Sequence, residues 1–332
     1  MKFLIRLTLI VALPLLILNM TSCAEHDETR VLKLAHGLDP SHPVHEAMVY
    51  FGERIADKSN GNMRLDIYPS EQLGSERETI ELLQIGSLDI TKVSTSPLEG
   101  FVPVYQVFGV PYLFRNQEHR FNVLEGEIGK RLLTEPEPYR IRGLCFYDAG
   151  SRSFYTKNDP INHPDDLTGL KIRVQESPTA LQMVRAMGGS PTPIAWGELY
   201  SALQQGIVDG AENNPPSFYL SNHYEVCKFY SLDEHTAVPD VLIISTETWN
   251  EMSDEERQIV QEAADESAQH QKKLWAEATQ EALEAVQEAG VEVIYPEKAP
   301  FQESVQSMYE TYQEQPEIYG LIQKIQAMGA PS

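Results

Sequence analysis

Arginine and glutamine alternate with apolar residues in a short segment in the middle of the chain. Across residues 170–175, a period of two places the apolar side chains on one face of a strand and Arg173 and Gln175 on the other, near its carboxyl end. Ligands of open α/β sheets bind outside the carboxyl ends of strands, and a guanidinium group matches a carboxylate with paired donors. The pattern predicts a carboxylate-binding side chain at Arg173, with a surface ion pair as the alternative.

Further polar side chains accompany two other strand patterns. Arg152 lies in a β-like stretch over 150–155, where it either contacts the same ligand or pairs with a surface acid. Two prolines end a strand pattern over 207–212, which leaves Asn213 and then Asn214 beyond its carboxyl tip. Asparagine at such a place either donates to and accepts from a ligand or caps the next helix. Both asparagines are therefore candidates for ligand binding.

An internal repeat supplies two more candidates. Residues 83–89 resemble residues 203–209 at an offset of 120, each a helix end, a glycine and a strand start. This match indicates two similar lobes, although a common helix-turn-strand unit also produces such similarity by chance. The same offset aligns Glu76 with Trp196 at helix N-termini. Glu76 either accepts hydrogen bonds from sugar hydroxyls or offsets the helix dipole, and Trp196 either stacks on a sugar or fills the core.

Three histidines in the loop near residue 40 form the other chemical cluster. His36, His42 and His45 do not by themselves supply a zinc site, which needs three or four ligands with oriented partners, so ordinary loop hydrogen bonds are favoured. His36 is kept as a ligand-binding candidate. The sequence has no GxSxG, HExxH, GxxxxGK[ST] or GxGxxG motif, and neither Cys145 nor Cys227 belongs to a CxxC or CxxH pair. We therefore expect neither a cofactor nor a metal, and no enzyme activity.

The elements that would hold these side chains alternate between strand and helix. Strand patterns fall at 31–35, 63–68, 88–93, 143–147, 171–175, 207–213 and 291–295, and helix patterns at 43–58, 75–85, 178–187 and 197–205. Ser253 with Glu256 opens a helical pattern that runs without glycine or proline to Ala289, long enough to cross two lobes. Its acidic side, which includes Glu262 and Glu266, is interpreted as a solvated face.

This order predicts an α/β, two-lobed periplasmic-binding-protein-like fold (type II-like) with the long helix spanning both lobes. We expect lobe I to contain residues 31–149 and 239–276, and lobe II residues 150–238 and 277–332. Only Cys145 and Cys227 lie in this body, and the sequence leaves open whether they pair.

The first residues have the form of a secretory signal. A positive start, an apolar run and small residues lead to Cys23, which predicts removal of residues 1–22 and either lipidation of Cys23 or ordinary cleavage nearby. With 26 Lys and Arg against 49 Asp and Glu, the chain has a formal net charge of −23. Such a surface disfavours nucleic acid and anionic membranes as partners. We expect a periplasmic protein whose membrane contact is limited to an N-terminal lipid in the case that Cys23 is lipidated.

Several ordered motifs resemble the solute receptors of tripartite ATP-independent periplasmic (TRAP) transporters. The similar stretches are 73–78, 148–155, 169–177 and 208–214, and the likeness covers nearly all of the mature chain. It implies two α/β lobes that close on an organic acid, with Arg173 holding the carboxylate and Arg152 and Asn213 assisting. The sequences of residues 173–177, 193–198 and 210–217 are similar to those of the hexuronate-binding branch, although Pro215 stands where those relatives often carry tryptophan.

The resemblance implies delivery of glucuronate or galacturonate to TRAP membrane subunits driven by an ion gradient. Three other functions stay open at this stage. One is a secreted enzyme acting on acidic sugars, and another is a receptor for a keto acid, an aldonate or a dicarboxylate. The third is a receptor that docks to a signalling protein. Gln175, Asn213 and Glu76 are expected to select hydroxyl positions on a ligand that Arg173 anchors.

Overall fold

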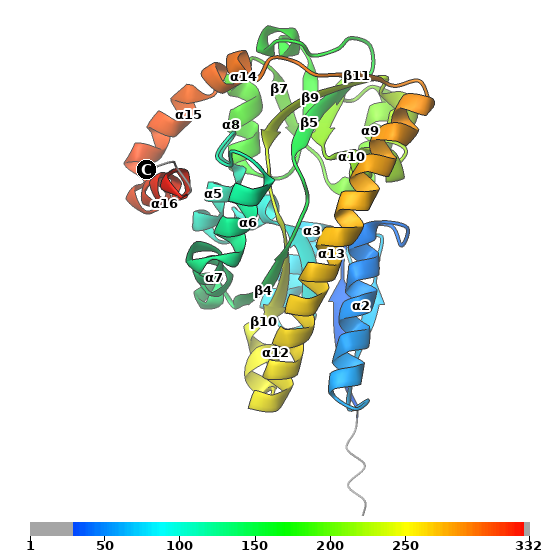
Figure 1. The fold of residues 1–332 in the computed structure, drawn as a ribbon, viewed down its shortest axis with the longest axis vertical. Helices are drawn as coiled ribbons and strands as arrows, with labels where there is room; N and C mark the ends of the chain where they lie inside the picture. Colours follow the sequence, from blue (N-terminus) through cyan, green and yellow to red (C-terminus); the bar gives the residue numbers. More distant parts are fainter. Residues whose placement is uncertain (1–28, 329–332) are drawn as a thin grey trace, which may run out of the picture.

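A computed structural model describes residues 29–328, which form two sheet-containing lobes stacked along the long axis of the molecule (Figure 1). The lobe I sheet has the strand order β2-β1-β3-β10-β4, with β1 parallel to β2 and β3 and with β10 antiparallel to β3 and β4. Its strands are β1 (Arg30–Ala35), β2 (Met63–Tyr68), β3 (Ile90–Ser94), β4 (Ile141–Tyr147) and β10 (Asp240–Ser245).

The lobe II sheet has the order β11-β9-β5-β8-β6-β7, with β6 parallel to β7 and β8 and with β5 antiparallel to β8 and β9. Its strands are β5 (Arg152–Thr156), β6 (Lys171–Val174), β7 (Ser190–Pro193), β8 (Gly210–Asn213), β9 (Phe229–Thr236) and β11 (Glu292–Ile294). The α/β prediction is confirmed, although β3 and β8 begin later than the sequence pattern suggested.

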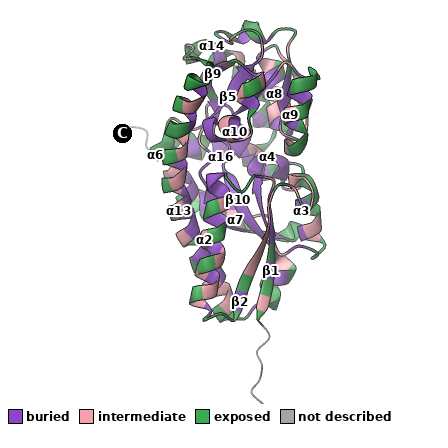
Figure 2. Ribbon diagram, turned by 90° about the vertical axis from the view of Figure 1, so that its right-hand side faces the viewer, coloured by how far each residue is buried: buried purple, intermediate pink, exposed green. Residues whose placement is uncertain are grey.

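Helices surround both sheets and leave the most buried residues in the sheets and between the lobes (Figure 2). Those beside the lobe I sheet are α2 (Pro43–Lys58), α3 (Glu76–Gln84), α4 (Thr95–Leu98), α5 (Gln106–Gly109), α6 (Gln117–Glu125), α7 (Glu127–Thr134) and α12 (Thr246–Glu251). Those that follow lobe II strands are α8 (Pro178–Ala186), α9 (Leu199–Gln205), α10 (Pro215–Leu220) and α11 (His223–Val226). The remaining helices are α13 (Asp254–Glu288), α14 (Lys298–Ser304), α15 (Gln306–Thr311) and α16 (Pro316–Ala327).

The two lobes share one plan, which supports the repeat inferred from the sequence. Five strands of lobe II, in the order β7-β6-β8-β5-β9, reproduce both the order and the directions of β2-β1-β3-β10-β4. In each lobe a helix ends at a left-handed glycine, Gly86 at φ 74° and Gly206 at φ 73°. The next aspartate in each, Asp89 or Asp209, accepts a 2.8 Å hydrogen bond from a backbone N–H of the neighbouring strand. Strands β3 and β8 begin at the residue directly after each of these aspartates.

The helix α13 joins the lobes, as predicted. The expected capping box of Ser253 and Glu256 opens its 35 residues, and its Val260 packs in the lobe I core while Val286 packs in the lobe II core. Figure 1 shows it running along both lobes beside α2 and α10. Its acidic side is not only solvated: Glu262 forms an ion pair with Lys58 at 2.9 Å, and Glu266 lies within 2.8 Å of Lys58 as well.

The end of the chain differs from the expected division. The side chains of α14 and α15 pack in lobe II, but those of α16 join the lobe I core beside Val93 and Val241. The expectation that all of residues 277–332 belong to lobe II is therefore wrong for α16. Its apolar stripe consists of Ile318, Leu321, Ile322 and Ile325.

Two other expectations concern the cysteines and the N-terminus. Cys145 and Cys227 are both free and buried. The predicted signal sequence and Cys23 lie outside the described residues. Between residues 29 and 328, none of the helices is long and apolar enough to cross a membrane.

Candidate functional site

A cavity of about 60 Å³ lies between the lobes, where the carboxyl ends of strands from both sheets meet. Lobe I contributes the loops after β1 and β3 and the start of α3, and lobe II contributes the ends of β6 and β8 and the turn before α9. The two strand connections between the lobes and Trp275 of α13 complete the wall. Because hydrogen bonds cross from one lobe to the other around this cavity, the structure is a closed form.

Arg173 carries a buried charge with unused donor capacity. Its side chain lies on β6 with the residue only 3% exposed, and its Nε donates to the carbonyl oxygen of Ile194 at 2.9 Å. Within the described chain its Nη1 is buried without a hydrogen-bond partner. Burial lowers the pKa of Arg173 from its usual value. A buried guanidinium without a facing acid is costly, so this site favours an anion that arrives with the ligand.

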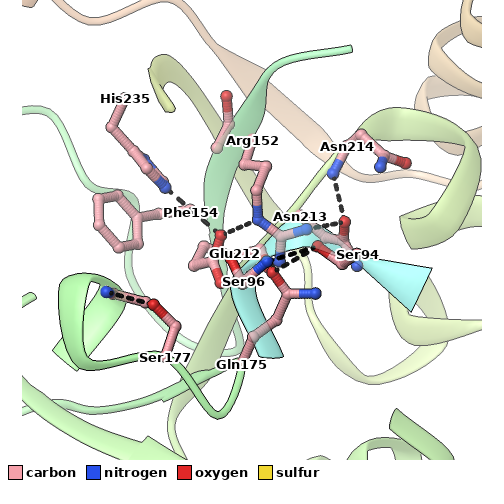
Figure 3. Close-up of polar contacts among 12 residues, drawn as sticks. Ser94, Ser96, Arg152, Phe154, Gln175, Ser177, Glu212, Asn213, Asn214 and His235 are labelled. Atoms are coloured by element: carbon pink, nitrogen blue, oxygen red, sulfur yellow. Dashed lines mark hydrogen bonds and ion pairs between the residues drawn. The ribbon is translucent and has the colours of Figure 1, made fainter. Parts of the chain in front are cut away.

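Arg152 is placed very differently, because its donors are used within lobe II (Figure 3). Its Nε and Nη2 form a two-pronged contact with the carboxylate of Glu212, and Nη1 donates to Asn213 Oδ1 at 2.9 Å. Nη2 also donates to the Glu212 carbonyl oxygen at 2.8 Å. Arg152 lines the cavity, but its guanidinium chiefly positions Asn213 at the tip of β8.

A buried histidine extends this network. His235 Nδ1 lies 2.8 Å from Asp233 Oδ2, and its Nε2 lies 3.5 Å from Glu212 Oε2. Burial alone would lower the pKa of His235, but the Asp233 and Glu212 carboxylates together outweigh burial and raise it to about 9. Burial alone would raise the pKa of Glu212, but Arg152 and His235 together outweigh burial and lower it to about 2. At neutral pH, His235 and Glu212 therefore both carry their charge.

The raised pKa of His235 predicts a loss of stability in alkaline solution. A group with a higher pKa in the folded than in the unfolded state stabilises the fold fully below the unfolded value, near 6.5, and loses this effect as pH rises to about 9. We expect this contribution, roughly 3 kcal/mol, to disappear between these pH values. Thermal unfolding of wild type and His235→Gln across this range tests it. Parallel curves for both proteins would contradict the assignment.

Lobe I holds a matching buried pair, which the sequence analysis missed. Lys92 Nζ lies 3.0 Å from Asp240 Oδ2 and 3.5 Å from Glu76 Oε1, and all three line the cavity. The strand registers align Lys92 with Glu212 and Asp240 with Arg152 in the repeat, so the two lobes hold equivalent cross-strand pairs with the charges exchanged. The offset of 120 could have indicated Lys92, because it aligns this lysine with the acid Glu212 in the repeat.

The predicted Glu76 lies at the start of α3 in this lobe I cluster. Its Oε1 accepts from the backbone N–H of Ser94 at 2.9 Å, and burial raises its pKa. Gln175 of lobe II faces Ser94 of lobe I, and the Ser94 Oγ donates to the Gln175 Oε1 at 3.4 Å (Figure 3). Trp196 forms a side wall, with its ring centre 5.8 Å from the Arg173 guanidinium. These side chains place acceptors, an amide and an aromatic face around the free cation.

Asn214 lies at the cavity and also caps a helix, whereas His36 lies away from the cavity wall. Asn214 touches the cavity, but its Oδ1 caps α10 by accepting from the Ser217 N–H at 2.9 Å. His36 does not line the cavity, because its Nε2 meets His45 Nδ1 at 3.0 Å and its Nδ1 accepts from the Leu38 N–H. His42 reaches the wall instead, with Nε2 3.5 Å from Ser217 Oγ across the lobes. The histidine that faces the site is therefore His42, six residues after the predicted His36.

The geometry suits a small anion that also carries hydroxyl groups. The Arg173 guanidinium has a free donor that can bind a carboxylate. The carboxylates and amides that line the same cavity, which belong to Glu76, Asp240, Gln175 and Asn213, can pair with hydroxyl groups. Residues 29–328 contain no group of three or more His, Cys, Asp or Glu side chains that could hold a metal ion. The fold and this site define a two-lobed binding protein for small solutes.

The chain belongs to the bacterial extracellular solute-binding protein family 7, whose DctP family model matches residues 34–315. Among curated relatives, the uncharacterized protein YiiZ of Salmonella typhimurium is 39% identical over 259 residues, covering 78% of this chain and 79% of YiiZ. A solute-binding protein of Chromohalobacter salexigens is 36% identical over 235 residues, covering 71% of this chain and 70% of the relative.

Solved structures of high similarity hold sugar acids. A TRAP periplasmic solute-binding protein from Roseobacter denitrificans with bound β-D-glucuronate is 38% identical, with a TM-score of 0.87 over 90% of this chain and 99% of that one. One from Xanthobacter autotrophicus with bound β-D-galacturonate is 37% identical, with a TM-score of 0.87 over 89% of this chain and 99% of that one. The resemblance to TRAP solute receptors is thereby confirmed, together with the two-lobed fold.

Proposed function

We propose that this protein is a periplasmic receptor that binds a hexuronate, of the glucuronate or galacturonate type, and delivers it to TRAP membrane subunits. The observation that carries the proposal is Arg173, whose buried guanidinium keeps an unpaired donor at the wall of a cavity between two closed lobes. Similar structures with bound glucuronate and galacturonate support the choice of ligand.

In this proposal the ligand carboxylate pairs with Arg173 and supplies the acceptor that the Arg173 guanidinium lacks in the closed cavity. Hydrogen bonds to a charged group contribute about 1.5–3 kcal/mol each, so two of them account for a large share of the binding free energy. The ring hydroxyls meet Glu76, Gln175 and Asn213, and the apolar face of the sugar lies against Trp196. The ligand stabilises the closed form because these contacts come from both lobes and form together only there.

The protein acts on no chemical bond in this account. Lys92 is paired with Asp240 and Arg152 with Glu212, whereas Arg173 keeps an unpaired donor at the cavity for the ligand. The membrane subunits are its expected partners because the closed and open forms present different surfaces to them. Periplasmic location follows from the same role.

A thermal-shift panel followed by calorimetry tests the ligand class. We expect β-D-glucuronate and β-D-galacturonate to raise the unfolding temperature, because a ligand that binds only the folded state stabilises it by mass action. The neutral sugars glucose and galactose serve as controls that lack only the carboxylate, and should give no shift. A larger shift with an aldonate, a keto acid or a dicarboxylate would overturn the hexuronate assignment. Release of a modified sugar during the assay would indicate an enzyme.

A further inference from the structure

A loop of lobe I reaches lobe II at the mouth of the cavity. The loop follows β2 and is held by backbone hydrogen bonds from Ser70 to Leu38 and from Glu71 to His36, at 3.0 and 3.1 Å. Ser70 and Glu71 both have left-handed backbones, with φ of 55° and 56°. Two successive non-glycine residues in this region are unusual and are kept only where the surroundings fix them. The loop therefore presents Glu71 in a defined direction.

The Glu71 side chain makes a direct contact with lobe II. Its Oε1 accepts from the backbone N–H of Gly197 at 3.2 Å. Gly197 belongs to the short turn Trp196–Glu198, whose first residue forms the aromatic wall of the cavity. The contact therefore fixes the backbone next to Trp196 against lobe I. Glu71 itself does not line the cavity, so this contact lies beside the ligand site rather than within it.

The fit at this contact depends on a missing side chain. A Cβ atom added to Gly197 would lie 2.3 Å from Glu71 Oε2 and 3.2 Å from Glu71 Cδ. Gly197 is not in the left-handed region, so an alanine there suits the backbone itself. The obstacle to a side chain at position 197 arises only when the two lobes meet.

The charge of Glu71 is adapted to partial burial. Burial, followed by the nearby carboxylates of Glu76 and Glu198, raises the pKa of Glu71, while the Gly197 hydrogen bond and Arg173 lower it. The carboxylate therefore loses solvation on closure and regains part of it through one backbone donor. This balance suits a contact that forms and breaks with each cycle of closure.

We propose that the Glu71–Gly197 contact is a latch that holds the lobes closed and sets how long a bound solute stays. The inference rests on the proposed function, because it concerns the closed form of the same site. The latch positions the Trp196 turn over the ligand without touching the ligand. Its loss affects dissociation more than association, since most affinity differences among variants of one site appear in the dissociation rate.

Four variants test the latch with β-D-glucuronate, using calorimetry for affinity and tryptophan fluorescence for dissociation. We expect Glu71→Ala to weaken binding about tenfold through faster dissociation, and Glu71→Gln to lose less because its amide oxygen still accepts. Gly197→Ala should weaken binding about as much as Glu71→Ala, because the Glu71 carboxylate must move away from the added methyl group and give up its hydrogen bond. The double variant Glu71→Ala with Gly197→Ala should bind no more weakly than Glu71→Ala alone, because the added methyl group no longer meets the carboxylate. Gly320→Ala, with no neighbouring atom within 4 Å of its added Cβ, is the matched control.

A ligand-free measurement separates the latch from the proposed function. Spin labels on Ile85→Cys and Ile207→Cys, two exposed positions on lobes I and II, report the distribution of lobe distances. We expect Gly197→Ala to move this distribution toward longer distances. Identical distributions, unchanged dissociation in Gly197→Ala, or additive losses in the double variant would overturn the latch. A wild type that binds no hexuronate would instead contradict the proposed function.

Discussion

An Arg173→Ala variant is expected to bind β-D-glucuronate about a hundredfold or more weakly than the wild type. The guanidinium is buried and keeps a free donor, so the ligand carboxylate would enter the cavity without a counter-charge once it is removed. Truncating one partner of a buried charge pair costs about 2–5 kcal/mol, largely because the other charge stays unpaired. Calorimetry with the purified proteins measures the difference directly.

The same variant should fold normally. Arg173 has no acid partner among the described residues, and its one internal hydrogen bond goes to the Ile194 carbonyl. Without ligand, we expect its unfolding temperature to stay close to that of the wild type. Arg173→Lys keeps the charge but loses the planar pair of donors, and should bind between the two. Arg185→Ala removes an exposed arginine of the same lobe and serves as the control. Equal affinity of Arg173→Ala and wild type would remove the basis of the proposed function.

A Glu212→Ala variant is expected to lose about 3 kcal/mol or more of folding stability. Removing this carboxylate leaves Arg152 and the protonated His235 buried together without the acid between them. Breaking a buried pair by deleting one member costs about 3–5 kcal/mol, because an uncompensated charge remains. Thermal unfolding of the ligand-free protein measures the loss.

A double variant distinguishes pairing from simple loss of volume. Arg152→Met with Glu212→Leu removes both charges and keeps apolar bulk, so it should be more stable than Glu212→Ala alone. The loss in Glu212→Ala should also shrink as pH rises toward 9, because His235 then gives up its charge. A Glu212→Ala protein that unfolds like the wild type at neutral pH would show that the network contributes little.

The fold could be predicted because its signals are local. Strand and helix periods located most elements, and the capping residues Ser75 and Ser253 marked the starts of α3 and α13. The packing of α16 could not be predicted in the same way. Its stripe of apolar residues shows that one face is buried, but a helical period does not indicate which lobe covers that face.

The site was predicted in part for the same reason. Arg173 could be predicted from the alternation of residues along one strand. Asn213 could be predicted from the prolines that end another strand. The pairing of Arg152 with Glu212 depends on the antiparallel register of β5 against β8, which no single segment contains. Lys92 lies in a strand whose five residues are all buried, so its position shows no alternation that would indicate a face. Long-range register, rather than residue type, set this limit.

The return of α16 to lobe I has a practical consequence for measuring motion. Strand β1 near the start of the described chain and α16 near its end both belong to lobe I, while lobe II is joined only through internal segments. Dyes attached at Thr29 and Ala327 would thus both move with lobe I, and the energy transfer between them should stay constant throughout a binding cycle. Immobilising the protein by either end would likewise leave the other lobe free to swing.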